Sequence, residues 1–325
     1  AQDRFGTIDR DILRRTETPR TAPAGSRDAL LAPQPTPAQL AIDVIHYDVD
    51  IAFDHTTSLV EGRVTALVEV LIEPLDRIEF NADPVLSILA AEIEGSGPVD
   101  FTRSADVVTF HLSGLFFAGQ RLTLSVRFAG SPAGAFYPGL FFSYDGGTRP
   151  VIYSLSEPWS ARTWWPCKDY PDDKATFEIA LSVREPLTAA SNGIYLGASD
   201  TTRWGEPFRR YRWREQLPMS TYLFSIAAAE YAVLTDHFVY APGETMQIVN
   251  YVFPRHVAAA SEDLSIASAA LEFFSDLLGL YPFVDEKYGV AICKLGGGME
   301  HQTLTSYGDM LIRGDHAYDW IYIHE

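Results

Sequence analysis

The amino-acid sequence predicts an α+β protein in which a large β-rich domain precedes a mixed α/β segment. Three observations support this fold class. Apolar and polar residues alternate with period two in several segments between residues 41 and 231. Turn-forming residues separate these segments at short intervals. Strongly helical spacing of apolar residues begins only after residue 260, so we place a domain boundary near residue 231.

The composition is that of a globular protein. The 325 residues are 47% hydrophobic, which is enough for a sizeable core. No apolar run reaches the roughly 20 residues that a membrane helix needs. The formal net charge of -18 argues against nucleic acid as a partner, because a polyanion would be repelled. Cys167 and Cys293 do not make a disulfide framework, and we expect two free buried thiols.

Residues 1–40 lack apolar periodicity, and residues 18–37 are rich in Pro, Ala and Thr. We therefore expect a flexible extension or a wrapping arm there. The first residue is Ala1 rather than Met, and no charged segment followed by an apolar one precedes it. Such a start indicates a mature or trimmed chain. It favours a periplasmic or secreted protein over the alternative, a cytoplasmic one.

The β-rich domain, residues 41–231, is predicted from its alternating segments. The first places one apolar set on a single face of a sheet: Ile45, Tyr47, Val49, Ile51 and Phe53. Further strands are predicted at residues 60–70, 122–128, 177–183, 209–214 and 221–227. Asn192 and Gly193 form a pair typical of a hairpin turn. Residues 233–240 and 246–253 are predicted to be strands of the following segment.

The mixed segment, residues 232–325, contains the first strong helix signal. Ser261 is a suitable N-cap and Gly279 a suitable C-terminal stop. The apolar residues between them follow helical spacing and are expected to pack in the core: Leu264, Ala267, Leu271, Phe274 and Leu278. Residues 288–293 are predicted to form a buried strand. Asp315 is expected to cap a last helix that carries His324 and Glu325.

Three segments contain residues suited to chemistry. His324-Glu325 is the first half of H-E-x-x-H, in which two His one helical turn apart bind zinc and the Glu takes a proton from water. Residues 296–301, G-G-G-M-E-H, place a carboxylate after a flexible backbone. Residues 156–169 are dense in Trp and charge. Each has a plain structural alternative: an ordinary helical His, a turn before an edge strand, and core aromatics with a solvated or ion-paired rim.

Together these segments resemble the zinc aminopeptidases of the aminopeptidase N and leukotriene-hydrolase type, which are gluzincins. G-G-M-E-H at 297–301 is similar to the family's G-x-M-E-N, about two dozen residues before H-E. S-E-P-W-S-A-R-T-W-W-P-C-K-D at 156–169 is similar to its E-P-x-x-A-R-x-x-F-P-C-x-D. K-A-T-F at 174–177, S-N-G at 191–193 and Y-P at 281–282 resemble three further family segments. The resemblance covers residues 41–325.

The resemblance implies a saddle-like β domain followed by the first part of a thermolysin-like catalytic domain. It also implies a peptide substrate with a free N-terminus. Glu157 and Glu300 would hold the substrate's ammonium, because a carboxylate recognises a charge that a mid-chain peptide lacks. Gly297, Gly298 and Met299 would form an edge strand along the substrate. His324 would be a zinc ligand, and Glu325 would be the general base.

The sequence departs from the family pattern at two places. His301 replaces the usual Asn; it could still bond a substrate carbonyl, with a charge that varies with pH. The second His and the distal Glu ligand would lie beyond Glu325, so we expect the chain alone to bind zinc weakly and to be inactive. The alternatives are a non-catalytic peptide-binding or scaffold module of the same fold, and an unrelated β-sandwich interaction protein. The sequence does not indicate the oligomeric state.

Overall fold

The computed structural model describes residues 34–325, of which Thr36–Glu325 form one compact unit. The predicted extension therefore lies outside the described residues as far as residue 33. Its last residues form helix α1 (Pro37–Leu40). Thr36 and Gln39 cap this helix reciprocally, and the buried Gln39 amide donates to Asn81 Oδ1 over 2.9 Å.

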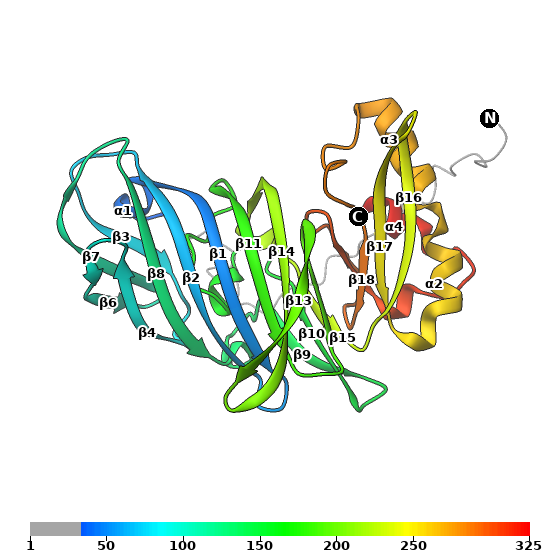
Figure 1. The fold of residues 1–325 in the computed structure, drawn as a ribbon, viewed down its shortest axis with the longest axis horizontal. Coiled ribbons are helices and arrows are strands. Elements are labelled where there is room, and N and C mark those ends of the chain that lie inside the picture. The colour runs from blue at the N-terminus through cyan, green and yellow to red at the C-terminus, as the bar shows by residue number, and fades with distance from the viewer. Residues whose placement is uncertain (1–33) are drawn as a thin grey trace, which may run out of the picture. The chain divides into compact units, whose positions relative to one another are not determined.

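The largest sheet has eight strands and confirms the predicted β-rich part (Figure 1). In spatial order its strands are β13 (Ile194–Arg203), β14 (Glu206–Ser220), β11 (Lys174–Val183), β1 (Ile42–Asp54), β2 (Leu59–Val70), β8 (Arg121–Gly130), β4 (Leu86–Ile93) and β5 (Gly97–Pro98). β1 pairs antiparallel with β2 and parallel with β11, with His46 opposite Thr176. The sheet is therefore mixed.

Three smaller sheets complete the strands of residues 34–325. A four-stranded sheet contains, in spatial order, β12 (Thr188–Ser191), β15 (Ile226–Ala229), β10 (Arg149–Ser154) and β9 (Leu140–Asp145). A three-stranded sheet contains β3 (Leu75–Asn81), β7 (Val107–Phe116) and β6 (Phe101–Ser104). A five-stranded sheet contains β16 (Ala232–Ala241), β17 (Glu244–Val252), β18 (Val290–Cys293), β20 (Thr305–Gly308) and β19 (Gly298–Met299). β19 is thus at an edge.

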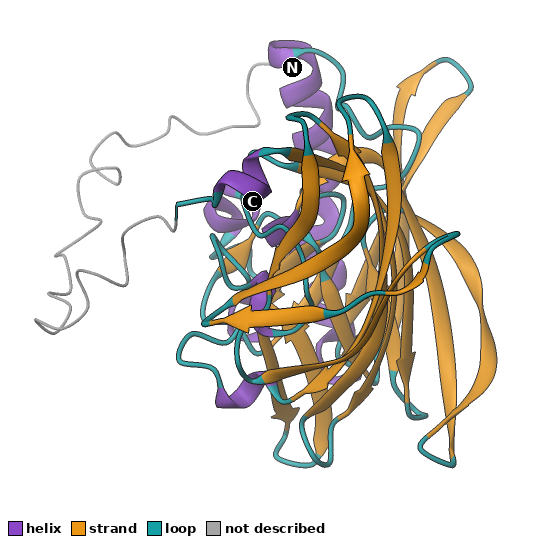
Figure 2. Ribbon diagram, turned by 90° about the vertical axis from the view of Figure 1, so that its left-hand side faces the viewer, coloured by secondary structure: helices purple, strands orange, loops and turns teal. Residues whose placement is uncertain are grey.

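Strands dominate the chain, and the helices are few and short (Figure 2). The α-helices after α1 are α2 (Val257–Asp263), α3 (Ala267–Leu278) and α4 (Asp319–His324). Single turns of 3-10 helix are η3 (Pro132–Gly134), η4 (Ala161–Thr163), η5 (Thr221–Leu223), η6 (Pro254–His256), η7 (Leu264–Ile266) and η8 (Asp309–Leu311). Both α2 and α3 contact β16. None of these helices combines the length and apolar character required to cross a membrane.

The core follows from the alternation seen in the sequence. The predicted apolar set of β1 is buried except for Ile45, and Val49 and Ile51 have no exposed surface. Ile45 is only partly buried, at a shift of the strand register between Val44 and His46. The same core contains the fully buried Trp164 and Trp165 of the Trp-rich segment. Cys167 and Cys293 are free and buried, as predicted. The predicted boundary near residue 231 lies between β15 and β16, and the division into two domains remains a prediction.

The predicted long helix is divided and starts earlier than expected. Helix α2 begins at Val257, so Ser261 lies inside it and donates to the Val257 carbonyl over 2.8 Å instead of capping it. The turn η7 then separates α2 from α3. Leu264 and Ala267 are buried as predicted, but Phe274 is 37% exposed and Leu278 is 77% exposed. The apolar stripe packs in the core only at its N-terminal end.

The last helix is shorter than predicted. Asp315 does not cap it; its carboxylate accepts from the Ala317 amide, and α4 begins four residues later at Asp319. The cause is Asp263, which is buried and accepts from the amides of Arg313, Gly314 and His316. These amides are engaged outside the helix, so the helix starts only beyond them.

The predicted hairpin at Asn192 and Gly193 does not form. Gly193 has the left-handed φ of +71° that the turn prediction required. However, the strands on either side, β12 and β13, belong to different sheets. The turn transfers the chain from one sheet to another, and it places Asn192 and Gly193 against the loop that follows β19.

Candidate active site

Glu325 lies directly against β19. A side chain at Gly298 would meet the carboxylate of Glu325, so the present position of that carboxylate depends on glycine at this contact. Burial raises the pKa of Glu325 to about 7, and the charges of Glu300 and Glu157 add to the rise while His324 opposes it. Three predicted site residues therefore share one electrostatic environment. Like charges gathered in this way favour a cation among them.

Tyr222 belongs to the same environment, although the sequence did not single it out. Burial raises the pKa of its hydroxyl, and Glu300 and Glu157 raise it further. The sequence predicted a strand over residues 221–227, in which Tyr222 has no special place. In the structure it lies in the single turn η5, between β14 and β15. An isolated Tyr in such a turn gives no sequence signal.

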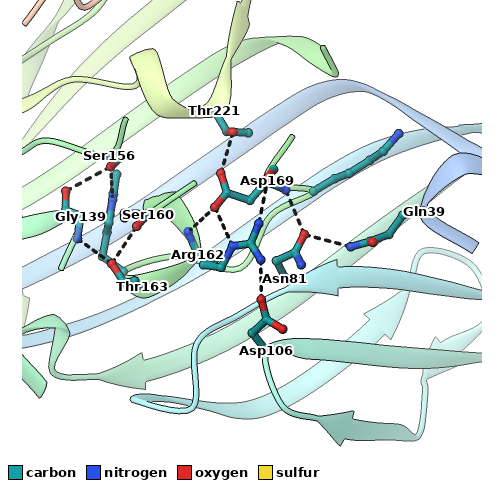
Figure 3. A network of polar contacts seen from close by, with 12 residues as sticks. Gln39, Asn81, Asp106, Gly139, Ser156, Ser160, Arg162, Thr163, Asp169 and Thr221 are labelled. Atoms are coloured by element: carbon teal, nitrogen blue, oxygen red, sulfur yellow. Dashed lines mark hydrogen bonds and ion pairs between the residues drawn. The ribbon is translucent and has the colours of Figure 1, made fainter. Parts of the chain in front are cut away.

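Glu157 is exposed, but the segment that carries it is held by a buried polar network (Figure 3). Ser156 accepts from Trp164 Nε1 over 3.0 Å and donates to the Gly139 carbonyl over 3.1 Å. Thr163 accepts from the Gly139 amide over 2.8 Å and donates to the Ser160 carbonyl over 2.7 Å. The residues on both sides of Glu157 are thereby fixed in place.

Asp169 is the centre of the second half of this network (Figure 3). Its carboxylate accepts from Arg162 Nε over 2.9 Å and from Thr221 Oγ1 over 3.0 Å. Arg162 also pairs with Asp106. Burial lowers the pKa of Arg162, but the adjacent Asp169 and Asp106 hold it above its usual value. Because Thr221 precedes Tyr222, the network joins the segment of Glu157 to that of Tyr222.

Apart from the exposed Glu157, the charged residues of the segment 156–169 are buried and do not form a solvated rim. The side chains of Arg162 and Asp169 are 8% and 0% exposed. Lys168 forms a second buried pair with Asp173 and donates to the Ile42 carbonyl over 2.6 Å. Ion pairing was one of the two alternatives left open by the sequence. Burial of the pairs makes the segment a rigid part of the core, which suits a support for a site.

Glu300 is exposed and stands between β19 and a buried loop, residues 301–304. The first loop residue, His301, is 2% exposed, and its Nδ1 bonds Ser306 Oγ over 3.0 Å. Its Nε2 is buried without a partner. Burial lowers the pKa of His301 to about 3, so the ring is neutral in the physiological range. Its charge does not vary there, contrary to what an unperturbed His would do.

Thr303, in the same loop, contacts three distant segments. Its hydroxyl accepts from the Gly193 amide over 2.7 Å and lies 3.3 Å from both Lys287 Nζ and Glu215 Oε2. Burial raises the pKa of Glu215 to about 8, and the neighbouring Glu286 adds to the rise. Burial lowers the pKa of Lys287 to about 7, opposed by both carboxyl groups. The sequence did not identify these residues, which belong to no motif.

His324, the predicted zinc ligand, is exposed at the end of α4. In residues 34–325 no group of three His, Cys, Asp or Glu side chains is arranged to hold a metal. A catalytic zinc needs three protein ligands. The described residues therefore offer one candidate ligand beside one candidate base, and they do not make a complete zinc site by themselves.

An apolar pocket opens beside the end of α4. It has a volume of about 290 Å³ and is lined by α3, by three tyrosines and by the end of α4. The tyrosines are Tyr281, Tyr288 and Tyr322. Glu325 forms part of its wall and has one buried carboxylate oxygen without a partner. The Glu325 carboxylate and an apolar pocket thus adjoin, an arrangement suited to a ligand with one charged and one apolar part.

Comparison with known proteins gives one consistent result. The sequence pattern of the peptidase M1 N-terminal domain matches residues 44–223. Leucine aminopeptidase 2 of Coccidioides immitis is 29% identical over 191 residues, which are 56% of this chain and 28% of that protein. The leukotriene A-4 hydrolase homolog of Botryotinia fuckeliana is 22% identical over 301 residues, which are 86% of this chain and 44% of that protein.

A solved structure is also similar. A mutant of a two-domain M1 zinc metallopeptidase, bound to L-tryptophan, has a TM-score of 0.71 and 26% identity. The match covers 84% of this chain and 62% of that one. The chain thus spans less than half the length of the curated relatives above.

Proposed function

The chain belongs to the M1 peptidase family, and from this premise we propose that it is the N-terminal portion of a zinc-dependent aminopeptidase. The whole protein would remove N-terminal residues from peptides. The observation that carries the proposal is the gathering of Glu157, Glu300 and Glu325 in one electrostatic environment, next to an edge strand. The relatives named above support the reaction class.

Glu157 and Glu300 are proposed to bind the substrate's free ammonium. A cation beside these carboxylates relieves their mutual repulsion, and an ammonium supplies both the charge and three donors. Both side chains are exposed, so a ligand can reach them. The solved relative that binds L-tryptophan supports this role, because a free amino acid carries the same ammonium group. A peptide without a free N-terminus would lack this contact.

The peptide backbone is proposed to lie along β19. This strand is at the edge of its sheet, and only its inner side pairs, with β20. Gly297 and Gly298 would let a substrate strand approach closely, with Met299 buried beneath. The unpaired Nε2 of the neutral His301 is buried, so it could bond a substrate carbonyl only if the loop opened. Among the proposed substrate-binding residues, His301 therefore has the least direct role.

His324 is the proposed first zinc ligand, and Glu325 the general base. In such enzymes the metal supplies activation of water at neutral pH. Glu325 follows His324 directly and lies against β19, the proposed place of the substrate strand, so its carboxylate is positioned to take a proton beside the metal and the peptide.

The test compares substrates with and without the free amine in the whole protein supplied with zinc. Leucine p-nitroanilide should be hydrolysed, and its N-acetyl derivative should not. Glu300→Gln should raise KM for leucine p-nitroanilide by about 10- to 100-fold, as expected for a hydrogen bond to a charged group. The control is Glu94→Gln, an exposed carboxylate on the strand-turn after β4, which should leave KM unchanged.

Two outcomes would count against the proposal. If Glu300→Gln had the KM of the unaltered protein, the ammonium site would be elsewhere. If the zinc-loaded protein bound leucinamide without hydrolysing any peptide, the non-catalytic peptide-binding module would be the better description.

A further inference from the structure

Thr303 has a backbone conformation that its residue type disfavours. Its φ is +63°, in the left-handed region that glycine adopts readily and β-branched residues rarely. The residue is 3% exposed, and it lies three positions after Glu300. A β-branched residue stays in this region only when its surroundings hold it there, and such sites gather around functional centres. The contacts that hold Thr303 in this conformation therefore indicate which part of the candidate site it supports.

The side chain and carbonyl of Thr303 are fully used by groups from elsewhere in the chain. The hydroxyl oxygen accepts from the Gly193 amide over 2.7 Å and from Lys287 Nζ over 3.3 Å, and its proton is available to Glu215 Oε2, 3.3 Å away. The carbonyl accepts from Lys287 Nζ over 3.1 Å. One hydroxyl has one donor and two acceptor positions, so Thr303 uses all three. Serine could do the same, whereas valine could not.

These partners connect the loop of residues 301–304 to strands that precede it in the chain. Gly193 is the turn between β12 and β13, and Glu215 is on β14. Gly193 cannot move away, because it packs directly on the carbonyl of Arg214 and has no room for a side chain. Its neighbour Asn192 donates to the carbonyls of Gln302 and of Leu223. Leu223 follows Tyr222, so one turn holds both the loop after Glu300 and the segment of Tyr222.

We propose that Thr303 is a positioning residue that fixes Glu300 relative to Glu157 and Tyr222, and thereby sets how tightly the substrate's ammonium is held. The inference rests on the proposed aminopeptidase function. Glu157 follows β10 of the four-stranded sheet, while Glu300 follows β19 of the five-stranded sheet. Two carboxylates carried by different sheets can hold one ammonium only if the distance between them is constant. The Thr303 hydroxyl is bonded to Gly193, Lys287 and Glu215, and it therefore links the loop after Glu300 to the turn and strand that precede it.

The experiment measures inhibition of the zinc-loaded whole protein by two ligands. Leucinamide carries the ammonium, and 4-methylpentanamide is the same molecule without it. Thr303→Val should raise the inhibition constant of leucinamide by about tenfold and leave that of 4-methylpentanamide within about twofold, because only the ammonium contact is displaced. Thr303→Ser keeps the hydroxyl and should restore the unaltered value. A purely structural defect would weaken both ligands equally.

A double variant separates positioning from general damage. In Glu300→Gln protein there is no carboxylate to position, so adding Thr303→Val should have no further effect on leucinamide. The control is Thr65→Val, which removes a hydroxyl bonded to Ser125 on the largest sheet and should change neither constant. If Thr303→Val failed to fold, Lys287→Met would remove a different partner of the same loop and should show the same selectivity for the amine.

The results that would overturn the inference are distinct from those that would overturn the function. If Glu300→Gln weakens leucinamide but Thr303→Val does not, Thr303 has no positioning role and the function stands. An equal effect of Thr303→Val with and without Glu300 also overturns the inference. If Glu300→Gln itself has no effect on leucinamide, the proposed function fails, and the role of Thr303 fails with it.

Discussion

The segment that carries Glu157 and the loop that follows Glu300 are held in different ways. The Glu157 segment is fixed by a buried ion pair between Arg162 and Asp169, seven residues apart. The Glu300 loop is fixed by a hydroxyl, Thr303, whose partners are as far as 110 residues away. The first support is local and charged. The second is distant, and its central group is neutral.

This difference shows that a residue can be held firmly in a site by contacts that no sequence motif indicates. The local support leaves a pattern in the sequence, because its members must keep their spacing. The distant support leaves only the turn signal of Asn192 and Gly193, because Glu215, Lys287 and Thr303 each lie alone in a separate strand or loop. The two supports should also respond differently to substitution. Three substitutions follow, from the largest expected effect on stability to the smallest, and then a pH dependence.

Arg162→Ala should be the most destabilising change. It leaves Asp169 buried and unpaired, so the free energy of unfolding should fall by about 3–5 kcal/mol. Chemical denaturation of the 325-residue chain measures this. The control is Arg77→Ala, which removes an exposed pair with Asp76 and should change stability little. A loss for Arg162→Ala no greater than for Arg77→Ala would show that the local support is not held by charge.

Gly193→Ala tests the distant support. A side chain there would meet the Arg214 carbonyl, and φ is +71°, so the free energy of unfolding should fall by about 1–3 kcal/mol. The matched control is Gly114→Ala on β7, where a side chain has open space and φ is not left-handed. Both are measured by thermal unfolding. Equal stability of the two variants would remove Gly193 from the support of the loop.

Gly298→Ala should affect activity more than stability. The new methyl group would displace the flexible Glu325 carboxylate rather than the backbone, and kcat of the whole protein should fall by about 10- to 100-fold. Gly296→Ala, two residues earlier, meets nothing within 4 Å and serves as the control. Steady-state kinetics on leucine p-nitroanilide distinguishes them. Unchanged kcat in Gly298→Ala would argue against Glu325 as the base.

The last prediction is a pH dependence of stability at the distant support. The pKa of Glu215 is raised from 4.5 to about 8, so the folded chain binds more protons than the unfolded chain between these values. The stability contributed by the protonated carboxyl is therefore present below this window and is lost as pH rises through it. The free energy of unfolding, compared with that of Glu215→Gln, should decline from about pH 5 to about pH 8.5.

Much of the fold could be predicted from the sequence, because a half-buried strand must alternate. β1 shows this from Tyr47 to Ile51, where the apolar residues are buried and the polar residues between them are not. The sheet order could not be predicted, since the pairing of β1 with β11 depends on residues about 130 positions away. The division of the long helix at η7 was also missed, and so was the exposure of Phe274 and Leu278. Helical spacing shows which residues share one face of a helix, but it does not show whether another element packs on that face.

The candidate site divides in the same manner. Glu157, Glu300 and Glu325 were found through motifs, and the structure brings them into one electrostatic environment. Tyr222 and Thr303 were not found, since their importance arises only from contacts made after folding. The neutrality of His301 was also beyond sequence reasoning, because burial sets its pKa.

The position of β1 has a consequence for how the chain is made. β1 leaves the ribosome before β2 and β11, and its edge toward β11 stays open until β11 has been synthesised. His46 and Thr176 are 130 residues apart. At translation rates of about 5–20 residues per second, that edge waits roughly 6 to 26 s for its partner. During this interval an unpaired strand edge invites pairing with other nascent chains. Slower synthesis between β2 and β11 should therefore increase misassembly and raise the need for chaperones.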